Sequence, residues 1–466
     1  MFQFLGKMLK NVSMDLIFGD HSNFMTEKEL AFQIVNKLTK AGFVAYFAGG
    51  CVRDLVMKQS ATDYDIATTA SPDQVIRLFD KTVAVGKQFG VMIVVMGEYQ
   101  FEIATFRREG PYRDGRHPET VSFTSPEEDA KRRDFTINGL FLNPLTEEII
   151  DYVEGKKDIE AKLIRTIGNP EERFEEDHLR MLRAIRFAAN LGFAIESRTW
   201  DTIKRLGHKI HSVSQERVRD ELVKMFTRSN AGLGLQLLSE SGLLAQILPE
   251  IEVMKGVQQP PEYHPEGDVF IHTKMLMDQL GHPSVVLAFG ALLHDVGKPN
   301  TFSNEGGKIH FYNHPHIGVQ IAEKLLTRLR FSNREIADIL SCVENHMKFA
   351  NVKEMRIGKL KQFVARENFS TELDLHKIDC LASHGKLELY HFLQEKVDEF
   401  KKEELRPKPI LNGHDVMALG IQAGPIMKEI LEEVYSLQLE KNFESKEDAL
   451  EWVKQNYLKP KKKGVS

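Results

Sequence analysis

The 466-residue sequence contains only three cysteines, and no two of them form a Cys-x-x-Cys pair. Cys51, Cys342 and Cys380 therefore provide neither a disulfide framework nor a zinc ribbon, and their scarcity favours a reducing compartment, for which we expect the cytoplasm. Long hydrophobic runs are also missing, because no stretch approaches the roughly eighteen apolar residues of a membrane span. Low-complexity tracts and internal repeats are absent as well. These absences predict a globular protein without a membrane partner.

A strong excess of charge of one sign is absent too, since the formal net charge is only −5. This balance gives no overall attraction to a polyanion, but a local basic face can still neutralise phosphates. Basic residues are numerous between Lys162 and Arg228, with acidic residues interleaved among them. The segment therefore indicates either a solvated helical surface or a contact with nucleic acid.

The chain is long enough for three or more packed units. Apolar runs at 44–48, 64–67, 91–96 and 101–106 predict strands, and capping patterns predict helices at 26–41 and from Ser71 onward. After about residue 169 helical periodicity dominates. We expect an N-terminal extension (1–25), an α/β head (26–160), a helical neck (161–257), a second helical module (258–385) and a C-terminal helical region (386–466). The segment 258–263 is the clearest predicted linker.

Two aspartates, Asp63 and Asp65, flank Tyr64 in one predicted strand. Side chains alternate along a strand, so both carboxylates are expected on one face, where they repel each other unless a cation lies between them. Oxygen ligands of this kind suit Mg²⁺. Glu102 is a single carboxylate in another apolar strand, and it would join the cluster if the two strands were neighbours. An Asp-x-Asp pair alone is weak evidence for catalysis.

A double glycine, Gly49 and Gly50, precedes this pair at the end of a predicted strand. Glycines allow the backbone to approach a triphosphate closely and to expose its N–H groups, although a plain turn would explain them equally well. Arg53 lies one helical turn downstream, where it can meet a phosphate.

The segments 49–54 and 63–67 resemble the signature of class II tRNA nucleotidyltransferases and the related bacterial poly(A) polymerases. The resemblance continues in the family's order through 103–107, 132–139, 176–186 and 412–420, and it covers most of the chain from about residue 40 to 440. It implies a polymerase-β-like head with a mixed sheet and helices, followed by an all-α body. It also implies transfer of nucleotides from CTP and ATP to the 3′ end of tRNA.

The resemblance assigns a role to each matching residue. Asp63 and Asp65 would hold Mg²⁺ while an RNA 3′-hydroxyl attacks the α-phosphate, with Glu102 in the same catalytic cluster. Gly49, Gly50 and Arg53 would bind the triphosphate. Arg133 and Asp134 would face the nucleotide, with Asp134 suited to the ribose hydroxyls; the alternative for this pair is a surface ion pair of little energetic value.

Asp177 and Arg180 stand three residues apart on a predicted helix and are expected to be neighbours. Cytosine and adenine both present an amine donor beside a ring-nitrogen acceptor, which a carboxylate and a guanidinium match, whereas uracil and guanine reverse both roles. In the family these two positions select the base. Arg183 and Arg186 follow at three-residue steps and resemble further nucleotide contacts; a solvated salt bridge is the alternative.

The product remains open at this point. The segment 110–118 resembles the flexible loop of CCA-adding members of the family, which favours addition of CCA. Enzymes that add only A to tRNA, and poly(A) polymerases, differ from these by few residues and stay as alternatives.

Histidines and aspartates in the second helical module resemble an HD domain. In that family His272, His294, Asp295 and Asp379 would bind one divalent metal, and His314 and His346 match positions that support a second ion. Imidazole with carboxylate suits Ni²⁺, Mn²⁺, Co²⁺ or Fe²⁺ better than Mg²⁺. Such a centre can hydrolyse phosphoesters at RNA ends or can remain as a structural remnant. A phosphohydrolase with a head that only binds RNA, and a non-enzymatic RNA scaffold, are therefore the two rival functions.

Overall fold

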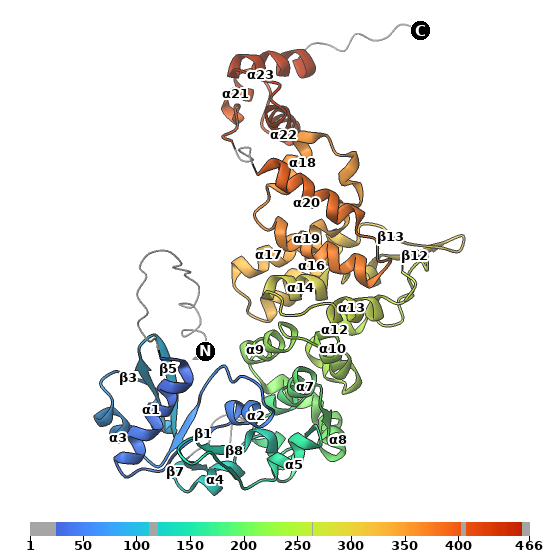
Figure 1. Cartoon of the computed structure of the whole chain (residues 1–466). Helices are drawn as coiled ribbons and strands as arrows, with labels where there is room; N and C mark the ends of the chain where they lie inside the picture. Colours follow the sequence, from blue (N-terminus) through green and yellow to red (C-terminus); the bar gives the residue numbers. More distant parts are fainter. Residues whose placement is uncertain (1–24, 111–119, 263, 402–406, 459–466) are drawn as a thin grey trace. The chain divides into compact units, whose positions relative to one another are not determined.

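The computed structural model describes residues 25–110, 120–262, 264–401 and 407–458 (Figure 1). The chain divides into unit 1, which runs to Glu252 and includes Arg328–Arg330, and unit 2, which begins at Val253. The predicted N-terminal extension and nearly all of the 110–118 loop lie outside the described residues.

Unit 1 begins with a seven-stranded mixed sheet in the order β3-β4-β5-β2-β1-β8-β9. Its strands are β1 (Ala45–Ala48), β2 (Ile66–Thr68), β3 (Thr82–Gly86), β4 (Val91–Met96), β5 (Tyr99–Thr105), β8 (Leu140–Asn143) and β9 (Glu148–Asp151). Only β2 and β5 pair in parallel; the other neighbours are antiparallel. The mixed sheet confirms the predicted head, although the sequence had indicated no strand at β3, β8 or β9.

Short helices connect and cover these strands. The predicted first helix is confirmed as α1 (Glu27–Lys40), whose capping box joins Thr26 to Glu29. It packs on β1 and β2, while α2 (Gly50–Val56) packs on β1 and β8 (Figure 1). The remaining elements of the head are α3 (Pro72–Leu78), β6 (Arg107–Glu109), β7 (Val121–Phe123), α4 (Pro126–Lys131), η2 (Thr136–Asn138) and α5 (Gly155–Glu160).

The rest of unit 1 is helical, as predicted, except for a parallel pair of two-residue strands, β10 (Leu163–Ile164) and β11 (Ala194–Ile195). Its helices are α6 (Pro170–Glu176), α7 (Leu179–Leu191), α8 (Ser197–Leu206), α9 (Gln215–Phe226), α10 (Ala231–Glu240), α11 (Leu243–Ile247) and α12 (Pro249–Glu252). Helix α7 is central, because it packs against both α9 and α10 and buries Leu182 and Ile185 completely.

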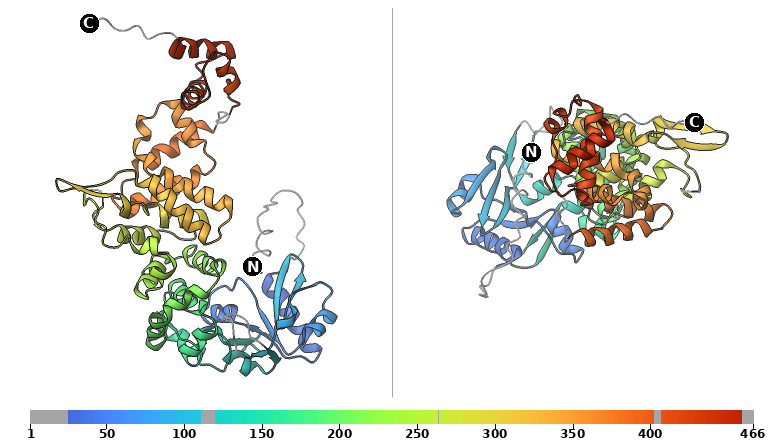
Figure 2. Two further views of the ribbon diagram at one scale, coloured as in Figure 1. Left: turned by 180° about the vertical axis from the view of Figure 1, so that it is seen from behind. Right: turned by 90° about the horizontal axis from the view of Figure 1, so that it is seen from above.

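Unit 2 is built from helices and one hairpin. The helices are α13 (Val269–Asp278), α14 (Val285–Leu293), α15 (Lys298–Thr301), α16 (His314–Arg328), α17 (Asn333–Asn345), α18 (Ile357–Val364), α19 (Phe369–Ala382), α20 (Glu388–Phe400), α21 (Gly413–Met417), α22 (Pro425–Leu439) and α23 (Lys446–Val453). The hairpin of β12 (Phe302–Glu305) and β13 (Lys308–Phe311) was not predicted; it extends from these helices (Figure 2).

The predicted linker at 258–263 is wrong in part. Gln259 is 1% exposed, and the bridge between Gln258 and Asp268 ties the segment to the start of α13. The amide of Gln259 donates to the carbonyl of Gly267 at 3.1 Å, so this part of the stretch is packed and hydrogen-bonded within unit 2.

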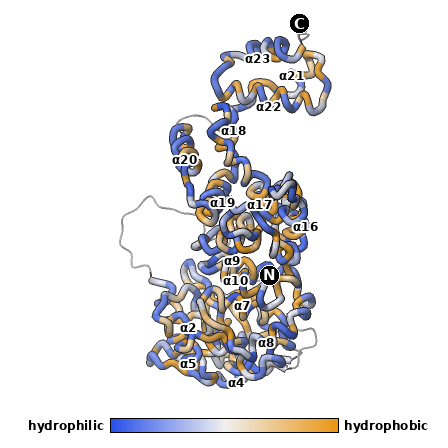
Figure 3. Tube along the Cα trace, turned by 90° about the vertical axis from the view of Figure 1, so that its right-hand side faces the viewer, coloured by the Kyte–Doolittle hydropathy of each residue, from blue (hydrophilic) through white to orange (hydrophobic). Residues whose placement is uncertain are grey.

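Hydrophobic and hydrophilic residues alternate along the helices (Figure 3). Among the described residues, no helix combines the length and the apolar composition that crossing a bilayer requires.

Candidate active site and metal centre

The Asp63–Asp65 pair lies in extended chain just before β2 rather than within it. The predicted alternation nevertheless holds, because Tyr64 is 7% exposed whereas both aspartates are open to solvent. The amide of Ala48 donates to the carbonyl oxygen of Asp65 at 3.0 Å, which fixes the extended backbone at this point against β1. The two carboxylates therefore emerge on the same side of the chain.

Glu102 is brought beside Asp65 by the parallel pairing of β2 with β5. Ile66 is in register with Ile103, so the residues immediately before them occupy equivalent positions on neighbouring strands. Asp65 keeps access to solvent, but the protein atoms around it remove part of its hydration. This partial desolvation, followed by the charges of Glu102 and Asp63, raises the pKa of Asp65 to about 7, and Arg133 only partly opposes this. Desolvation also raises the pKa of Glu102. The β2–β5 register thus places Glu102 beside Asp65, and Asp63 lies two residues before Asp65 on the same segment.

The proximity of Asp63, Asp65 and Glu102 indicates whether a cation fits between their carboxylates. The negative charges of Glu102 and Asp63 destabilise the Asp65 anion, and a divalent cation with oxygen ligands relieves that repulsion. In the described part of the chain, every group of three potential metal ligands with atoms within 4.8 Å of one another lies in unit 2. The carboxylates of the head are therefore farther apart than the ligands of a metal ion bound by protein atoms alone. Their chemistry suits Mg²⁺, which keeps part of its own water.

Gly49 forms the turn between β1 and α2, and Gly50 is the first residue of α2. Gly49 has φ 75°, a conformation that favours glycine, and a Cβ at this position would lie 3.2 Å from Nη1 of Arg133. Arg53 is on α2, as predicted, and its guanidinium donates to Asp54 Oδ1 and, at 2.9 Å, to Asn138 Oδ1. The turn thus leaves space for two arginine side chains beside the strand ends.

Arg133 and Asp134 are held by different partners. Arg133 donates to Asp129 Oδ2 and lies 5.0 Å from the ring centre of Phe141. Asp134 is 9% exposed and accepts from Arg183 Nε at 2.8 Å. Burial alone would raise the pKa of Asp134, but the guanidinium of Arg183 outweighs it and lowers that pKa to about 2. Asp134 is therefore part of a buried ion pair and not of a surface one.

The prediction that Asp177 and Arg180 share one helix is wrong. Helix α6 ends at Glu176, and Asp177 has φ −153°, outside helical geometry. Its Oδ1 accepts from the amide of Leu179, the first residue of α7, at 3.1 Å. Arg180 lies in the first turn of α7, where Nη1 donates to the carbonyl of Arg173 at 2.9 Å and to Glu176. The two residues remain close in sequence at a helix junction.

Helix α9 supplies two residues that the sequence analysis missed. Arg217 donates to both carboxylate oxygens of Asp177, at 3.1 and 2.6 Å. Glu221, 3% exposed, accepts from Arg186 at 2.5 Å and lies 3.8 Å from Arg183. Burial would raise the pKa of Glu221, but Arg186 and Arg183 lower it. A signal was present, since Arg217 and Glu221 are four residues apart and so lie on one face of a helix.

In unit 2, the predicted HD residues converge from several helices. His272 (α13) has Nε2 3.1 Å from Asp379 Oδ1 (α19), and His294, at the end of α14, has Nε2 3.1 Å from Asp295 Oδ2. His314 and His346 approach each other at 3.1 Å through their Nε2 atoms. Asp295 Oδ1 lies 3.5 and 3.6 Å from these two atoms.

These side chains form two adjacent groups with metal-ligand spacing, His272–His294–Asp379 and Asp295–His314–His346. Asp295 faces both groups, one oxygen toward each. Both ring nitrogens of His272, and Nε2 of His294, are buried without a well-aligned hydrogen-bond partner. Buried polar atoms are rarely left so, and a metal ion would satisfy them. The donor set therefore fits a transition metal.

The sequence analysis also missed the residues around this cluster. Glu266 Oε1 lies 2.7 Å from His272 Nδ1 and 2.9 Å from His264 Nδ1. Lys298 is 5% exposed and lies 2.7 Å from Asp295 Oδ2. Lys298 had a signal, because it follows the His-Asp pair at i+3 from Asp295; His264 and Glu266 were masked by the Pro-rich sequence around them.

Comparison with known proteins agrees with this arrangement. Residues 45–165 match the family model of the poly A polymerase head domain. Residues 192–255 match the model described as "Probable RNA and SrmB-binding site of polymerase A", and residues 267–382 match the HD domain.

The similar proteins include curated relatives and a solved structure. A CCA-adding enzyme of Bacillus velezensis is 45% identical over 218 residues, 47% of this chain and 55% of that relative, so the match spans just over half of the relative's length. A CCA-adding enzyme of Bacillus cytotoxicus is 31% identical over 91% of this chain and 97% of its own. The crystal structure of the Bacillus stearothermophilus CCA-adding enzyme in complex with CTP superposes with a TM-score of 0.72, at 27% identity, over 92% of this chain and 98% of that one.

A mixed-sheet head with clustered carboxylates, a helical neck and an HD module together define a nucleotidyltransferase of the poly(A) polymerase head-domain class. The match along nearly the whole length of the Bacillus cytotoxicus protein narrows this class. The chain belongs to the family of CCA-adding enzymes.

Proposed function

We propose that this chain adds CCA to the 3′ end of tRNA without a nucleic-acid template, consuming CTP and ATP and releasing pyrophosphate. The observation that carries the proposal is the β2–β5 register, which sets Glu102 beside Asp65 and Asp63 on one side of the head. Similarity to CCA-adding enzymes supports tRNA, CTP and ATP as the substrates. Addition of A alone to tRNA, and of poly(A), remain the alternatives within the same class of enzyme.

In this proposal the head performs the chemistry. Asp63, Asp65 and Glu102 are the residues that would hold Mg²⁺, which when bound supplies positive charge to the attacking 3′ oxygen and the departing pyrophosphate. The turn at Gly49 and Gly50 leaves the backbone open to the triphosphate, and Arg53 donates to its oxygens. Arg133, held by Asp129, adds a second positive charge on the same side.

The neck selects the base. Asp177 accepts from the exocyclic amine of cytosine or adenine, and Arg180 donates to the neighbouring ring nitrogen. UTP and GTP present the opposite groups and leave buried partners unpaired, at a cost of about 1–3 kcal/mol each. The bidentate contact from Arg217 supports this role, because it fixes the direction in which the Asp177 carboxylate points. We assign Arg183 and Arg186 to the nucleotide-facing side of α7, with Asp134 toward the ribose.

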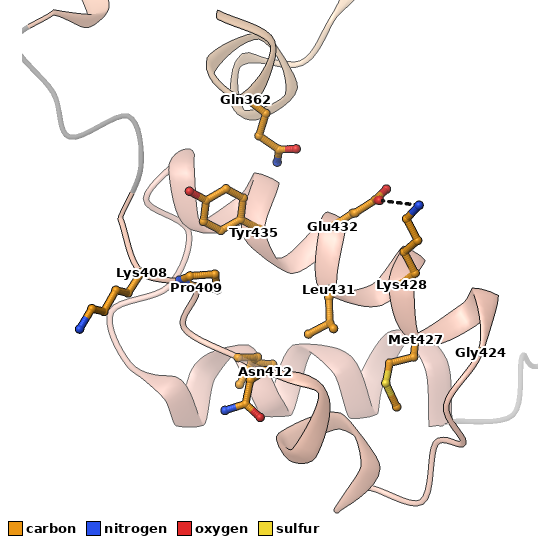
Figure 4. Close-up of a pocket in the computed structure, with 11 residues that line it drawn as sticks. Gln362, Lys408, Pro409, Asn412, Gly424, Met427, Lys428, Leu431, Glu432 and Tyr435 are labelled. Atoms are coloured by element: carbon orange, nitrogen blue, oxygen red, sulfur yellow. Dashed lines mark ion pairs between the residues drawn. The ribbon is translucent and has the colours of Figure 1, made fainter. Parts of the chain in front are cut away.

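The C-terminal region, from about residue 386, is the proposed binding site for the tRNA body. It contains a cavity of about 770 Å³ beside α22 (Figure 4). Leu411, Met427 and Leu431 give the cavity an apolar lining, and Lys408 and Lys428 stand beside it. Lys428 is paired with Glu432 Oε1 at 3.9 Å, which leaves Lys408 as the unpaired ammonium among the described lining residues of this cavity. Apolar surface with an ammonium group beside it suits a nucleobase and a neighbouring phosphate, which supports this assignment.

A second candidate function belongs to the HD module. We propose that His272, His294, Asp295 and Asp379 hold a transition metal such as Ni²⁺, Mn²⁺ or Co²⁺, with His314 and His346 serving a second ion beside Asp295. The buried imidazole nitrogens of His272 and His294, which lie near carboxylates but lack a well-aligned hydrogen-bond partner, favour this function. Such a metal supplies a polarised water, and the module would hydrolyse phosphoesters at RNA ends. We place the whole enzyme in the cytoplasm, which its three buried free cysteines support.

The test uses purified full-length protein with Mg²⁺, labelled CTP and ATP, and three RNAs: a tRNA ending at the discriminator nucleotide, the same tRNA ending in CC, and a short oligo(A). Addition of C, C and A to the first RNA, with one pyrophosphate per nucleotide, is the expected result. Activity confined to the second RNA would identify an A-adding enzyme, and processive extension of the third would identify a poly(A) polymerase. The Asp65→Ala variant is the negative control.

A further inference from the structure

Asn138 lies between two of the residues assigned to the nucleotide and belongs to no role given above. It ends the short 3-10 helix η2 (Thr136–Asn138) and is 7% exposed. Its Oδ1 accepts from Arg53 Nη1 at 2.9 Å, and its Nδ2 faces Asp134 Oδ1 at 3.4 Å. Its backbone carbonyl accepts from Arg133 Nη1 at 3.3 Å. Three nucleotide-site side chains thus converge on one buried residue.

The chemistry of its neighbours explains why this residue is an amide. A guanidinium can only donate hydrogen bonds, and an ionised carboxylate can only accept them. A side chain between Arg53 and Asp134 must therefore present an acceptor to one and a donor to the other. The Asn amide offers one of each, at the correct separation, and the two neighbours fix which way round it lies.

We propose that Asn138 is a positioning residue that couples the triphosphate end of the nucleotide site to its ribose end. Through Oδ1 it aims the Arg53 guanidinium, and through Nδ2 it steadies the Asp134 carboxylate. Neither effect requires Asn138 to touch the nucleotide. The inference rests on the proposed function, because it assumes that Arg53 meets the triphosphate and that Asp134 meets the ribose.

The geometry also explains how the coupling is shared. Asp54 holds Arg53 from one side through Nε and Nη2, which leaves Nη1 to Asn138. Arg183 and the amide of Phe135 hold the Asp134 carboxylate from the other directions. Asn138 joins these two clusters by hydrogen bonds, while the Phe187 ring lies against both Arg53 and Arg183, so removal of Asn138 takes away the polar link and leaves the aromatic contact.

Two substitutions separate the two arms. Asn138→Ala removes both arms, and we expect the KM for CTP and for ATP to rise about 10- to 100-fold, as for loss of a hydrogen bond to a charged group, with a much smaller change in kcat. Asn138→Asp keeps an acceptor for Arg53 but turns an oxygen toward Asp134. This variant should keep a KM within about threefold of wild type while losing preference for CTP over 2′-deoxy-CTP.

The decisive experiment is a double-mutant cycle on the full chain, with Arg53→Ala, Asn138→Ala and the double variant assayed for CTP and ATP addition. If Asn138 acts through Arg53, Asn138→Ala raises the KM much less in the Arg53→Ala background than in wild type, and any rise that remains belongs to the Asp134 arm. Multiplied KM effects, or an Asn138→Ala KM equal to wild type, would overturn the proposal.

Two controls keep the outcome readable. Asn143→Ala makes the same substitution in β8, where the side chain accepts only from the amide of Leu145; melting temperatures and KM values for this variant report the cost of losing a structural asparagine. Should Asn138→Asp fail to fold, the cycle still decides the Arg53 arm. Absence of nucleotide addition by wild type would instead refute the proposed function, so the two failures are distinguishable.

Discussion

Removal of the Arg217 guanidinium should weaken base selection without touching the base. Arg217 donates two charge-assisted hydrogen bonds to Asp177, at 3.1 and 2.6 Å, and such bonds contribute about 1.5–3 kcal/mol each. In Arg217→Ala only the amide of Leu179 still orients the carboxylate. If about 1.4 kcal/mol of the discrimination between cytosine and uracil is lost, the ratio of kcat/KM for CTP over UTP falls about tenfold. Arg217→Lys keeps one donor group, so its ratio of kcat/KM for CTP over UTP should lie between those of wild type and Arg217→Ala.

The assay is single-nucleotide addition to tRNA ending at the discriminator position, with CTP or UTP varied separately. Arg219→Ala is the matched control, because Arg219 lies on the same helix and pairs with its neighbour Asp220 at 2.8 Å. That variant should keep the wild-type ratio. The reasoning is refuted if Arg217→Ala also keeps the wild-type ratio, or if Arg219→Ala lowers it equally.

Three further outcomes are expected. The pKa of Asp65 is raised from 3.8 to about 7, so ionisation of Asp65 destabilises the folded protein as pH rises through that interval. Asp65→Asn should therefore raise the melting temperature at pH 8. Millimolar Mg²⁺ should raise the melting temperature of wild type but not that of the variant. The pKa of Asp134 is lowered to about 2, so the contribution of the ionised carboxylate to folding stability is present above pH 4 and is lost as pH falls through 2. The difference in melting temperature between wild type and Asp134→Asn should therefore become smaller across that pH range. Elemental analysis should find Ni²⁺, Mn²⁺ or Co²⁺ bound to wild type after loading and dialysis, and none on His294→Ala beyond a buffer blank.

Much of the arrangement of Asp63, Asp65 and Glu102 follows from local rules of extended chain and can be inferred from the sequence. Alternation of side chains in extended chain places Asp63 and Asp65 together, and the apolar residues around Glu102 mark a strand with one outward carboxylate. The partner strand was not visible in the sequence. It depends on a parallel pairing between segments separated by two other strands.

The neck was predicted less well, for two physical reasons. The helical pattern of 170–191 runs through Asp177 without interruption. In the structure, however, α6 ends before Asp177, and the Asp177 side chain accepts from the amide of the first residue of α7. An aspartate before an apolar run is a known start signal, so this break was within reach. The contact of Arg217 with Asp177 was not, since it joins residues forty positions apart through the packing of α9 on α7.

The hairpin of β12 and β13 shows a signal that was available and unused. Gly306 and Gly307 have φ values of 60° and 85°, as a two-residue turn requires, and a Gly-Gly pair between short strand-like runs predicts such a hairpin. The surroundings of the HD cluster had no such marker. His264 and Glu266 lie in a Pro-rich stretch whose fold follows from burial of Gln259 and its bond to Lys298.

A slip of β5 by one residue against β2 would turn Glu102 to the opposite face of the sheet. The same slip would bring Phe101 and Ile103, each 1% exposed, out of the interior and into water. Burial of such side chains contributes about 1.5–3 kcal/mol each, so the apolar neighbours of Glu102 hold it in place more firmly than any contact of its own. Phe101 and Ile103 thus serve both the packing of the interior and the position of the Glu102 carboxylate.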